Sequence, residues 1–462
     1  MGSPCRIRYG VVITKTKENP MMNARKQFTG IIVTLFRFLR NKKRALNLNK
    51  ILSAMIVSTG YTITSWLRST IDPIRTTTAY YNVATFGRSE PEFAQAIAHL
   101  VSQLKALDLW KRVYFIIDDT PTNRTGLKIS CAGYHHDPTP SKTNSTILYG
   151  HSWVVISILV PHPENGYVSI PLRAMLYIKK EDIHKLHNEG KTQYQFKTKH
   201  TMAVELIRWA SGVFRDVGKE MTLLIDGGYA SNEVISGASV AGVNVITRLR
   251  KDSVFYELPC HQITKRRGRP RKFGEQIDLK RDRHHWKRLQ CFGKTYEYKT
   301  LVVTSKLTAG KPFKIVISRT VKGKHHGNRV TLFSSDINQT AESILKEYSM
   351  RFSIEEMFKD LKEVEGFGKQ QVRTLDANIG TTTLCLLMYV AIELWAYGKT
   401  NQGLTKENRG EWDDPSRRAS HSDKRKALRN EILRNEFSRF YARRLESGIF
   451  RELENWLVSH CV

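Results

Sequence analysis

In the segment Tyr348–Lys362, YSMRFSIEEMFKDLK, helical spacing aligns one acid with three cations and a phenol. On a helix that turns by about 100° per residue, these side chains share one stripe, while the apolar side chains face the opposite way and can pack on a core. A carboxylate among cations can hold a divalent metal ion beside a phosphate group. A solvated face with i,i+4 ion pairs would give the same pattern. The stripe consists of Tyr348, Arg351, Glu355, Lys359 and Lys362.

Two hydrophobic runs upstream end in carboxylates. FIIDDT contains Asp118 and Asp119, and LLIDGGY contains Asp226. An Asp that closes a strand is often only a turn or cap residue, so each acid is informative only together with the others. Because neighbouring residues of a strand alternate faces, only one of Asp118 and Asp119 can face the crevice. Three distant acids that a fold brings together can hold two Mg²⁺ ions for phosphoryl transfer.

The chain is strongly basic. It has 462 residues, a formal net charge of +31 and a pI of about 9.9. This length predicts several domains, and a hydrophobic content of 40% is enough to form cores. Such a charge favours a polyanionic partner, DNA or RNA. A ribosome-associated or simply very basic protein is the alternative.

Cysteine usage and hydropathy exclude several classes of protein. None of the six cysteines forms a C-x-x-C pair, so we expect no zinc site and free thiols in a reducing compartment. The apolar run 383–397 is short for a membrane span and contains Glu393. We expect no membrane partner. The first residues lack a signal-peptide pattern, and Met21 or Met22 is an alternative start.

The first part of the chain is predicted to be helical. Residues 1–22 form an uncertain tail, and residues 23–110 form a helical domain. Within it, a helix over Ile51–Val57, a turn with Gly60 and a helix over Ile63–Arg68 predict a helix-turn-helix that binds DNA. Thr64 and Arg68 would then face a major groove. A plain helical bundle would show the same spacing.

The next part reads as an α/β layout. Strand-like runs near Val113, at 151–160 and at 168–178 are followed by a helical pattern at 201–217 and a strand at 221–226. In such layouts catalytic groups lie at strand ends. We therefore predict a core in two parts, with a linker and helical segment at the end: residues 111–235, residues 341–397 with the Glu355 helix, and residues 398–462.

Residues 236–340 are strand-like with few helical periods, which predicts a β-rich insertion. It contains KRRGRPRKFG, in which Arg269 and Arg271 flank Pro270 like the short hook that lies in A·T-rich minor grooves. A disordered basic loop that contacts phosphates is the alternative. Trp286 also lies in this segment.

Tyr348, Arg351, Glu355 and Lys362 fit the pattern Y-(2)-R-(3)-E-(6)-K. The chain thereby resembles bacterial insertion-sequence transposases of the DDE type, in the insertion sequence four (YREK) group. FIIDDT and LLIDGGY resemble the first and second acid strands of that group. The resemblance covers about residues 110–397. It implies an α/β fold with an RNase H-like core that a β-rich insertion interrupts, behind an N-terminal helical DNA-binding domain.

The resemblance also implies roles for particular residues. Asp119, Asp226 and Glu355 would be the catalytic acids and the ligands of two Mg²⁺ ions, for which Mn²⁺ can substitute. Asp119 is chosen over Asp118 because in relatives the ligand precedes a Thr, here Thr120. The DNA-binding residues would be Tyr348, Arg351, Lys359, Lys362, Arg269, Arg271, Trp286, Thr64 and Arg68. Trp286 would stack on a flipped base, and a buried or interface Trp is the alternative.

The resemblance further implies cleavage at transposon ends and transfer of the freed 3′-hydroxyl into target DNA. The partners would be terminal inverted repeats, target DNA and a second copy of the chain, in the cytoplasm at the nucleoid. Two alternatives stay open: a catalytically silent DNA-binding relative, and an RNase H-like nuclease that cuts without joining. One departure from the family concerns Gly227, which stands where some relatives have an Arg.

Overall fold

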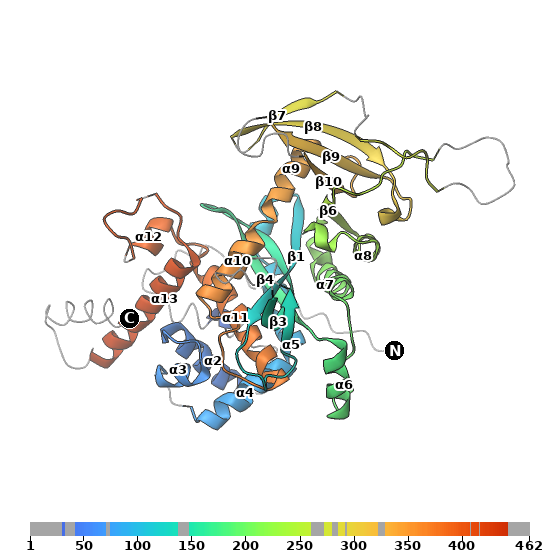
Figure 1. The fold of residues 1–462 in the computed structure, drawn as a ribbon. Coiled ribbons are helices and arrows are strands. Elements are labelled where there is room, and N and C mark those ends of the chain that lie inside the picture. The colour runs from blue at the N-terminus through green and yellow to red at the C-terminus, as the bar shows by residue number, and fades with distance from the viewer. Residues whose placement is uncertain are drawn as a thin grey trace, which may run out of the picture.

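The fold is taken from a computed structural model. It describes residues 30–32, 42–70, 74–136, 147–259, 272–279, 285–291, 293–321, 329–406, 408–414 and 416–441. A ten-stranded sheet forms its centre (Figure 1), in the order β2-β3-β1-β5-β6-β10-β9-β8-β7, with β4 paired to β3. The strands are β1 Arg112–Asn123, β2 Gly133–His136, β3 Ile147–His162, β4 Gly166–Tyr177, β5 Glu220–Ile225, β6 Val243–Leu249, β7 Lys287–Cys291, β8 Lys294–Val303, β9 Phe313–Thr320 and β10 Arg329–Ser334.

The middle of the sheet is parallel. β1 pairs in parallel with β5, and β5 with β6, while β3 runs antiparallel to β1. Parallel strands are usually covered on both faces and are continuously hydrophobic, and β1 and β5 are buried through Phe115–Ile117 and Leu223–Ile225. This mixed α/β architecture confirms the fold class expected from the strand and helix patterns.

Helices cover both faces of this sheet. They are α2 Lys42–Val57, α3 Ile63–Arg68, α4 Thr76–Arg88, α5 Glu90–Ser102, α6 Lys180–Asn188, α7 Lys199–Phe214, α8 Asn232–Val240, α9 Ala341–Met350, α10 Ser353–Glu363, α11 Leu375–Ala396, α12 Asn401–Thr405 and α13 His421–Tyr441. Short 3₁₀ turns are η1 Lys105–Leu109, η2 Arg215–Val217, η3 Gly227–Tyr229 and η4 Lys306–Thr308. α7 and α8 pack together beside the sheet, and α10 contacts β1 and β4.

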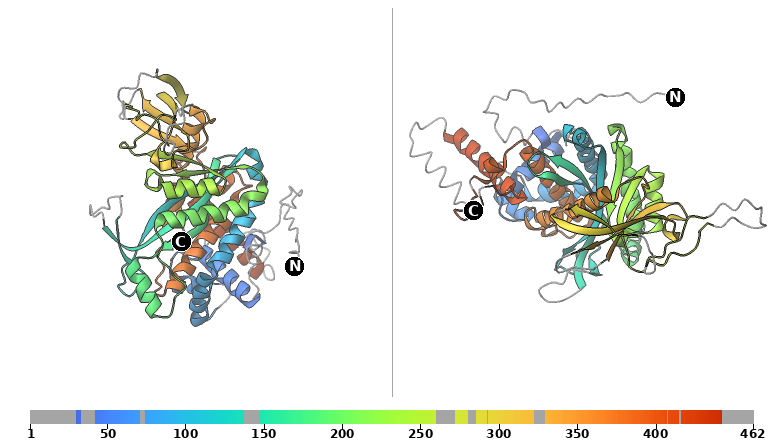
Figure 2. Two further views of the ribbon diagram at one scale, coloured as in Figure 1. Left: turned by 90° about the vertical axis from the view of Figure 1, so that its right-hand side faces the viewer. Right: turned by 90° about the horizontal axis from the view of Figure 1, so that it is seen from above.

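The later strands extend the central sheet instead of forming a separate one. β10 pairs antiparallel with β6, and β9, β8 and β7 follow outward. These outer strands lie at one end of the molecule, far from α2–α4 (Figures 1 and 2). β6 lies within the range 236–340 expected for the insertion, but its parallel pairing with β5 makes it part of the central sheet. Arg269 and Arg271 of the expected hook lie outside the described residues.

The N-terminal helices pack directly on the core. α4 runs against α11, and the approach is so close that a Cβ on Gly87 would lie 1.8 Å from the carbonyl oxygen of Asp376. A Cβ on Gly380 would lie 1.9 Å from the carbonyl oxygen of Val83. Among the described residues, α11 is the helix long and apolar enough to cross a membrane, but 89% of its apolar window is buried inside the protein. α11 is therefore the central core helix.

The segment around Glu355 forms two helices instead of one. α9 ends at Met350 and α10 begins at Ser353, with a turn at Arg351 and Phe352 whose backbone stays in the right-handed helical region. The apolar side of α10 is buried through Ile354, Met357 and Leu361, as its periodicity predicts. The expected apolar and polar faces are thus present, and the turn gives Arg351 a position between the helices.

Candidate active site

The register of the sheet brings Asp118 and Asp226 together. Ile117 is paired with Ile225 at the last step of the parallel β1–β5 ladder. Asp118 and Asp226 follow at the next position of each chain, and Asp226 keeps an extended backbone (φ −76°, ψ 162°). Equivalent positions on neighbouring parallel strands point to the same face. The two carboxylates therefore face the same side of the sheet, at its carboxyl edge.

Asp118 is strongly perturbed by its surroundings. Burial raises the pKa of its carboxyl to about 7; the charges of Asp119 and Asp226 also raise it, whereas Arg351 and the amide of Asp119 lower it. The Arg351 guanidinium donates to Asp118 Oδ2 at 3.2 Å. A buried carboxylate beside other acids is the arrangement that catalytic and metal-binding sites share.

Arg351 connects Asp118 to Glu355. Its second guanidinium nitrogen donates to Glu355 Oε1 at 2.8 Å, so one cation bridges β1 and the first turn of α10. Tyr348 lies beside it: burial raises the pKa of the Tyr348 phenol, and the charge of Asp226 raises it further. Tyr348, Arg351 and Glu355 thus meet Asp118 and Asp226 in one cluster, which we call the acid cluster.

Arg248 is a neighbour that the sequence did not reveal. It is exposed near the end of β6, and its charge acts on the Tyr348 phenol. Its carbonyl oxygen lies 2.9 Å from where a Cβ on Gly227 would be, so the backbone leaves no room for a side chain there. Gly227 carries no cation, as the sequence states, and Arg248 places one at the same edge.

Asp119 points away from the acid cluster, contrary to the choice made from the sequence. Its carboxylate accepts from Lys199 Nζ at 2.5 Å and from the Tyr229 hydroxyl at 3.1 Å. Because residues alternate along β1, placing Asp118 with Asp226 places Asp119 on the opposite face, where α7 begins. The Thr that follows Asp119 favours Asp119 as the metal ligand. In the structure, however, Asp118 is the residue that lies with Asp226 and Arg351.

The acid cluster supplies the carboxylate ligands of a magnesium site, but the Arg351 side chain is bonded to two of these carboxylates. Carboxylate oxygens are the ligands that Mg²⁺ prefers, and Asp118, Asp226 and Glu355 supply them. Within the described parts of the chain, no group of three His, Cys, Asp or Glu side chains is arranged to hold a metal ion. Arg351 occupies oxygens of two of the acids, so an ion would have to displace its side chain.

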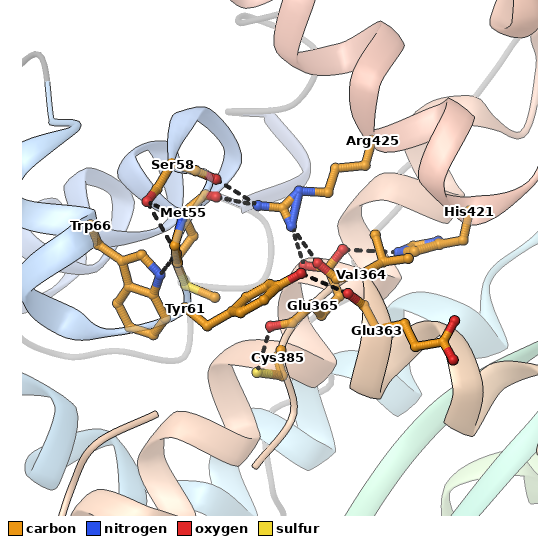
Figure 3. Close-up of polar contacts among 12 residues, drawn as sticks. Met55, Ser58, Tyr61, Trp66, Glu363, Val364, Glu365, Cys385, His421 and Arg425 are labelled. Atoms are coloured by element: carbon orange, nitrogen blue, oxygen red, sulfur yellow. Dashed lines mark hydrogen bonds and ion pairs between the residues drawn. The ribbon is translucent and has the colours of Figure 1, made fainter. Parts of the chain in front are cut away.

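The far end of α10 is held by the helices at the N-terminus (Figure 3). The Tyr61 hydroxyl, just before α3, donates to the carbonyl oxygen of Glu363 at 2.6 Å. Arg425 of α13 donates to the Val364 carbonyl at 2.7 Å and to the Met55 carbonyl of α2. The α2–α3 turn is thereby attached to the helix that carries Glu355.

A buried ionic network completes this attachment. His421 hydrogen-bonds Glu393 at 2.7 Å and Glu365 at 3.0 Å, and Lys424 donates to Glu393 at 2.6 Å. All four side chains are at most 5% exposed. Burial alone would lower the pKa of His421, but its two hydrogen-bonded glutamates raise it to about 9. The imidazolium therefore joins α13 to α11 and to the end of α10, in a segment expected to begin as a linker.

A basic cleft of about 650 Å³ opens at the end of β6 and on the outer strands. Arg248, Lys251 and Arg329 are among its lining residues, together with Trp286. The guanidinium of Arg319 lies 4.2 Å from the centre of the Trp286 ring, and that of Arg329 lies 5.8 Å away. Trp286 is half-buried among cations.

The remaining predicted DNA contacts lie on the surface. Lys359 is exposed on α10, and Lys362 is half-buried one turn later. α3 has the bounds expected for the second helix of a helix-turn-helix, with Thr62 as its N-cap. Thr64 and Arg68 are exposed on it. Their positions leave open both a groove-reading helix and a plain bundle.

The comparisons with known proteins identify the family of the chain and do not bear on individual site residues. Among curated proteins, none matches the chain at a significant level. The family model described as "DDE superfamily endonuclease" matches residues 34–309, more than half of the chain, including both acid strands. This match and the mixed α/β fold lead to one conclusion: the chain belongs to the DDE superfamily endonuclease family, whose members are transposase-type nucleases.

Proposed function

We propose that the protein is a DNA transposase of the insertion sequence four (YREK) group, with an RNase H-like core, that cuts at transposon ends and joins the freed 3′-hydroxyl to target DNA by cut-and-paste. One observation carries the proposal: Asp118 and Asp226 share one face of the sheet, and Arg351 links Asp118 to Glu355. The YREK residues are on the same helix pair. A net charge of +31 suits a polyanionic substrate.

Asp118, Asp226 and Glu355 are the residues that would hold two Mg²⁺ ions, with Mn²⁺ able to substitute. When bound, such ions activate the attacking oxygen and stabilise the leaving one. A divalent ion near Asp118 would favour the ionised carboxylate. Because the pKa of Asp118 is about 7, removing its proton near neutral pH costs little free energy. Arg351 leaves Asp118 and Glu355 and turns to a DNA phosphate, for which its planar fork is suited. Tyr348 and Lys362 donate to phosphates nearby.

The DNA-binding surface extends from the acid cluster in two directions. Arg248, Lys251 and Arg329 in the basic cleft provide phosphate contacts on the outer strands, with Trp286 beside them. On the other side, Thr64 and Arg68 on α3 contact the terminal inverted repeat. Lys359 lies between them on α10. Two paired ends require two copies of the chain, so we expect a homodimer on DNA, located at the nucleoid.

The test is cleavage of linear DNA that carries the element's ends, with Mg²⁺ or Mn²⁺. Asp118→Asn, Asp226→Asn and Glu355→Gln should each reduce cleavage at least a hundredfold. Glu356→Gln is the matched control, since Glu356 is exposed beside Glu355 on α10 and outside the acid cluster. Cleavage by all three variants at the parent rate would refute the assignment. Cleavage that depends on Asp119 but not on Asp118 would restore the choice made from the sequence.

A second function is favoured by one specific observation. Arg351 pairs with two of the acids, which would suit a family member that binds DNA without cutting it. DNA binding that needs no divalent ion, with no nicking under Mg²⁺ or Mn²⁺, would identify such a silent relative. A strand-transfer assay separates the transposase from a nuclease that cuts without joining, because only the transposase links the 3′ end to a second duplex.

A further inference from the structure

The contacts of Asp119 join the two chain segments that carry the acids. Asp119 directly follows Asp118, and Tyr229 is in η3, which begins one residue after Asp226. The Tyr229 hydroxyl donates to Asp119 Oδ1 at 3.1 Å, and Lys199 Nζ donates to Oδ2 at 2.5 Å. One carboxylate therefore ties the part of β1 beyond its ladder with β5 to the turn after β5 and to the start of α7. We call these three residues the clamp.

The clamp acts where the sheet itself no longer connects the two strands. The β1–β5 ladder ends at Ile117 and Ile225, one residue before Asp118 and Asp226. Beyond that point, the Asp226 backbone is held by the Thr247 hydroxyl, at 3.3 Å from its carbonyl oxygen, and by the bond within η3 from the Tyr229 amide. In the described part of the chain, the clamp provides a side-chain connection between the two acid-bearing segments beyond the ladder.

The parts of the clamp are rigidly supported. The Tyr229 ring is only 4% exposed, and it packs against the His200 ring with centroids 5.8 Å apart. His200 Nε2 donates to the Gly228 carbonyl at 3.0 Å. His200 in the first turn of α7 thus contacts η3 at two points, the Tyr229 ring and the Gly228 carbonyl. A buried hydroxyl that donates to a carboxylate forms a charge-assisted bond, which is stronger than a neutral one.

We propose that Asp119, Tyr229 and Lys199 are positioning residues that set the separation of Asp118 and Asp226 for divalent ions. This rests on the proposed function. Asp119 takes part in the chemistry through the geometry of its neighbour and does not touch the ions. Partners behind the ligands of a metal site commonly change affinity or activity by about 10–100-fold when removed.

The experiment is a Mn²⁺ titration of the full chain without DNA, read by the electron paramagnetic resonance of free and bound Mn²⁺. Tyr229→Phe removes one hydroxyl and keeps the ring; it should weaken Mn²⁺ binding about tenfold. Lys199→Met should act in the same direction and serves if Tyr229→Phe does not fold. Tyr177→Phe is the matched control, because the Tyr177 ring lies 5.8 Å from Lys199 Nζ and Tyr177 has no hydrogen bond to Asp119.

A second readout separates positioning from general stability. Thermal unfolding in EDTA should show Tyr229→Phe somewhat less stable than the parent, because one hydrogen bond to a carboxylate is lost. The variant should still be fully folded at the temperature of the titration, where its Mn²⁺ affinity falls. Parent-like Mn²⁺ affinity in Tyr229→Phe and Lys199→Met would overturn the clamp alone. Loss of all Mn²⁺ binding in Asp119→Ala, with binding kept in Asp118→Ala, would also overturn it, because Asp119 would then be a ligand. A parent chain that binds no Mn²⁺ would remove both the clamp's role and the proposed function.

Discussion

Replacing Asp118 by Asn should stabilise the folded protein although it removes a proposed catalytic acid. Burial raises the pKa of this carboxyl from 3.8 to about 7, so ionising it in the folded state costs free energy. At about 1.36 kcal/mol per unit, the difference corresponds to about 4 kcal/mol. The side chain is 21% exposed, and Asn loses the charge of the Arg351 pair. We therefore expect a net gain of about 1–3 kcal/mol near pH 8.

The sign of the pH dependence follows from the raised pKa. A carboxyl whose folded pKa is raised contributes stability that is fully present below its unfolded pKa, near 3.8, and lost as the pH rises through about 7. The stability difference between Asp118→Asn and the parent should therefore grow from about pH 4 to pH 7 and then level off. The assay is denaturant unfolding in EDTA at several pH values. Adding Mn²⁺ should reverse the order, because the parent binds the ion more tightly.

The neighbouring residue provides the control. Asp119→Asn removes the charge that Lys199 and Tyr229 bond to, so it should destabilise the protein by about 1–2 kcal/mol under the same conditions. Adjacent residues of one strand should thus respond with opposite signs. If Asp118→Asn is less stable than the parent at pH 8 in EDTA, the acid cluster does not strain the fold and the reasoning from burial is wrong.

Two further results are expected. Stability should fall as the pH rises from about 6.5 through 9, because the raised pKa of His421 contributes stability that is present below its unfolded value and lost above about 9. In unfolding scans from pH 6 to 10, the stability of His421→Gln should depend less on pH than that of the parent. An equal slope in both proteins would contradict the charged imidazolium. Gly380→Ala should lower the free energy of unfolding by more than about 2 kcal/mol, because its Cβ would clash with the Val83 carbonyl oxygen. Gly398→Ala is the control in the same unfolding measurement, because a Cβ at Gly398 has no atom within 4 Å.

Much of the fold could be predicted from local patterns. Hydrophobic runs identified β1 and β5 because buried parallel strands are continuously apolar. The apolar side of α10 followed from its period, and the turn between α2 and α3 from Gly60. The parallel pairing of β6 with β5 could not be predicted, because strand partners depend on contacts distant in sequence. The burial of His421 beside Glu365 and Glu393 also depends on how α13 returns to the core.

The choice between Asp118 and Asp119 shows how the candidate site could have been read differently. When FIID and LLID are aligned as equivalent buried strands, Asp118 stands opposite Asp226, which is the register the structure has. The alignment of the two runs favours Asp118, whereas the Thr after Asp119 favours Asp119. Lys199 and Arg248 left no comparable signal, because a lone cation in a basic chain does not indicate its partner.

The glycine contact between α4 and α11 bears on how this protein can be recombined with its relatives. Two backbones that meet without side chains between them tolerate no change of spacing, so an exchanged N-terminal segment would fit only with the α11 it evolved against. Chimeras made to retarget such enzymes would need crossover points that transfer both helices. The order of the chain conceals this requirement, since all ten strands of the sheet lie between α4 and α11 in the sequence.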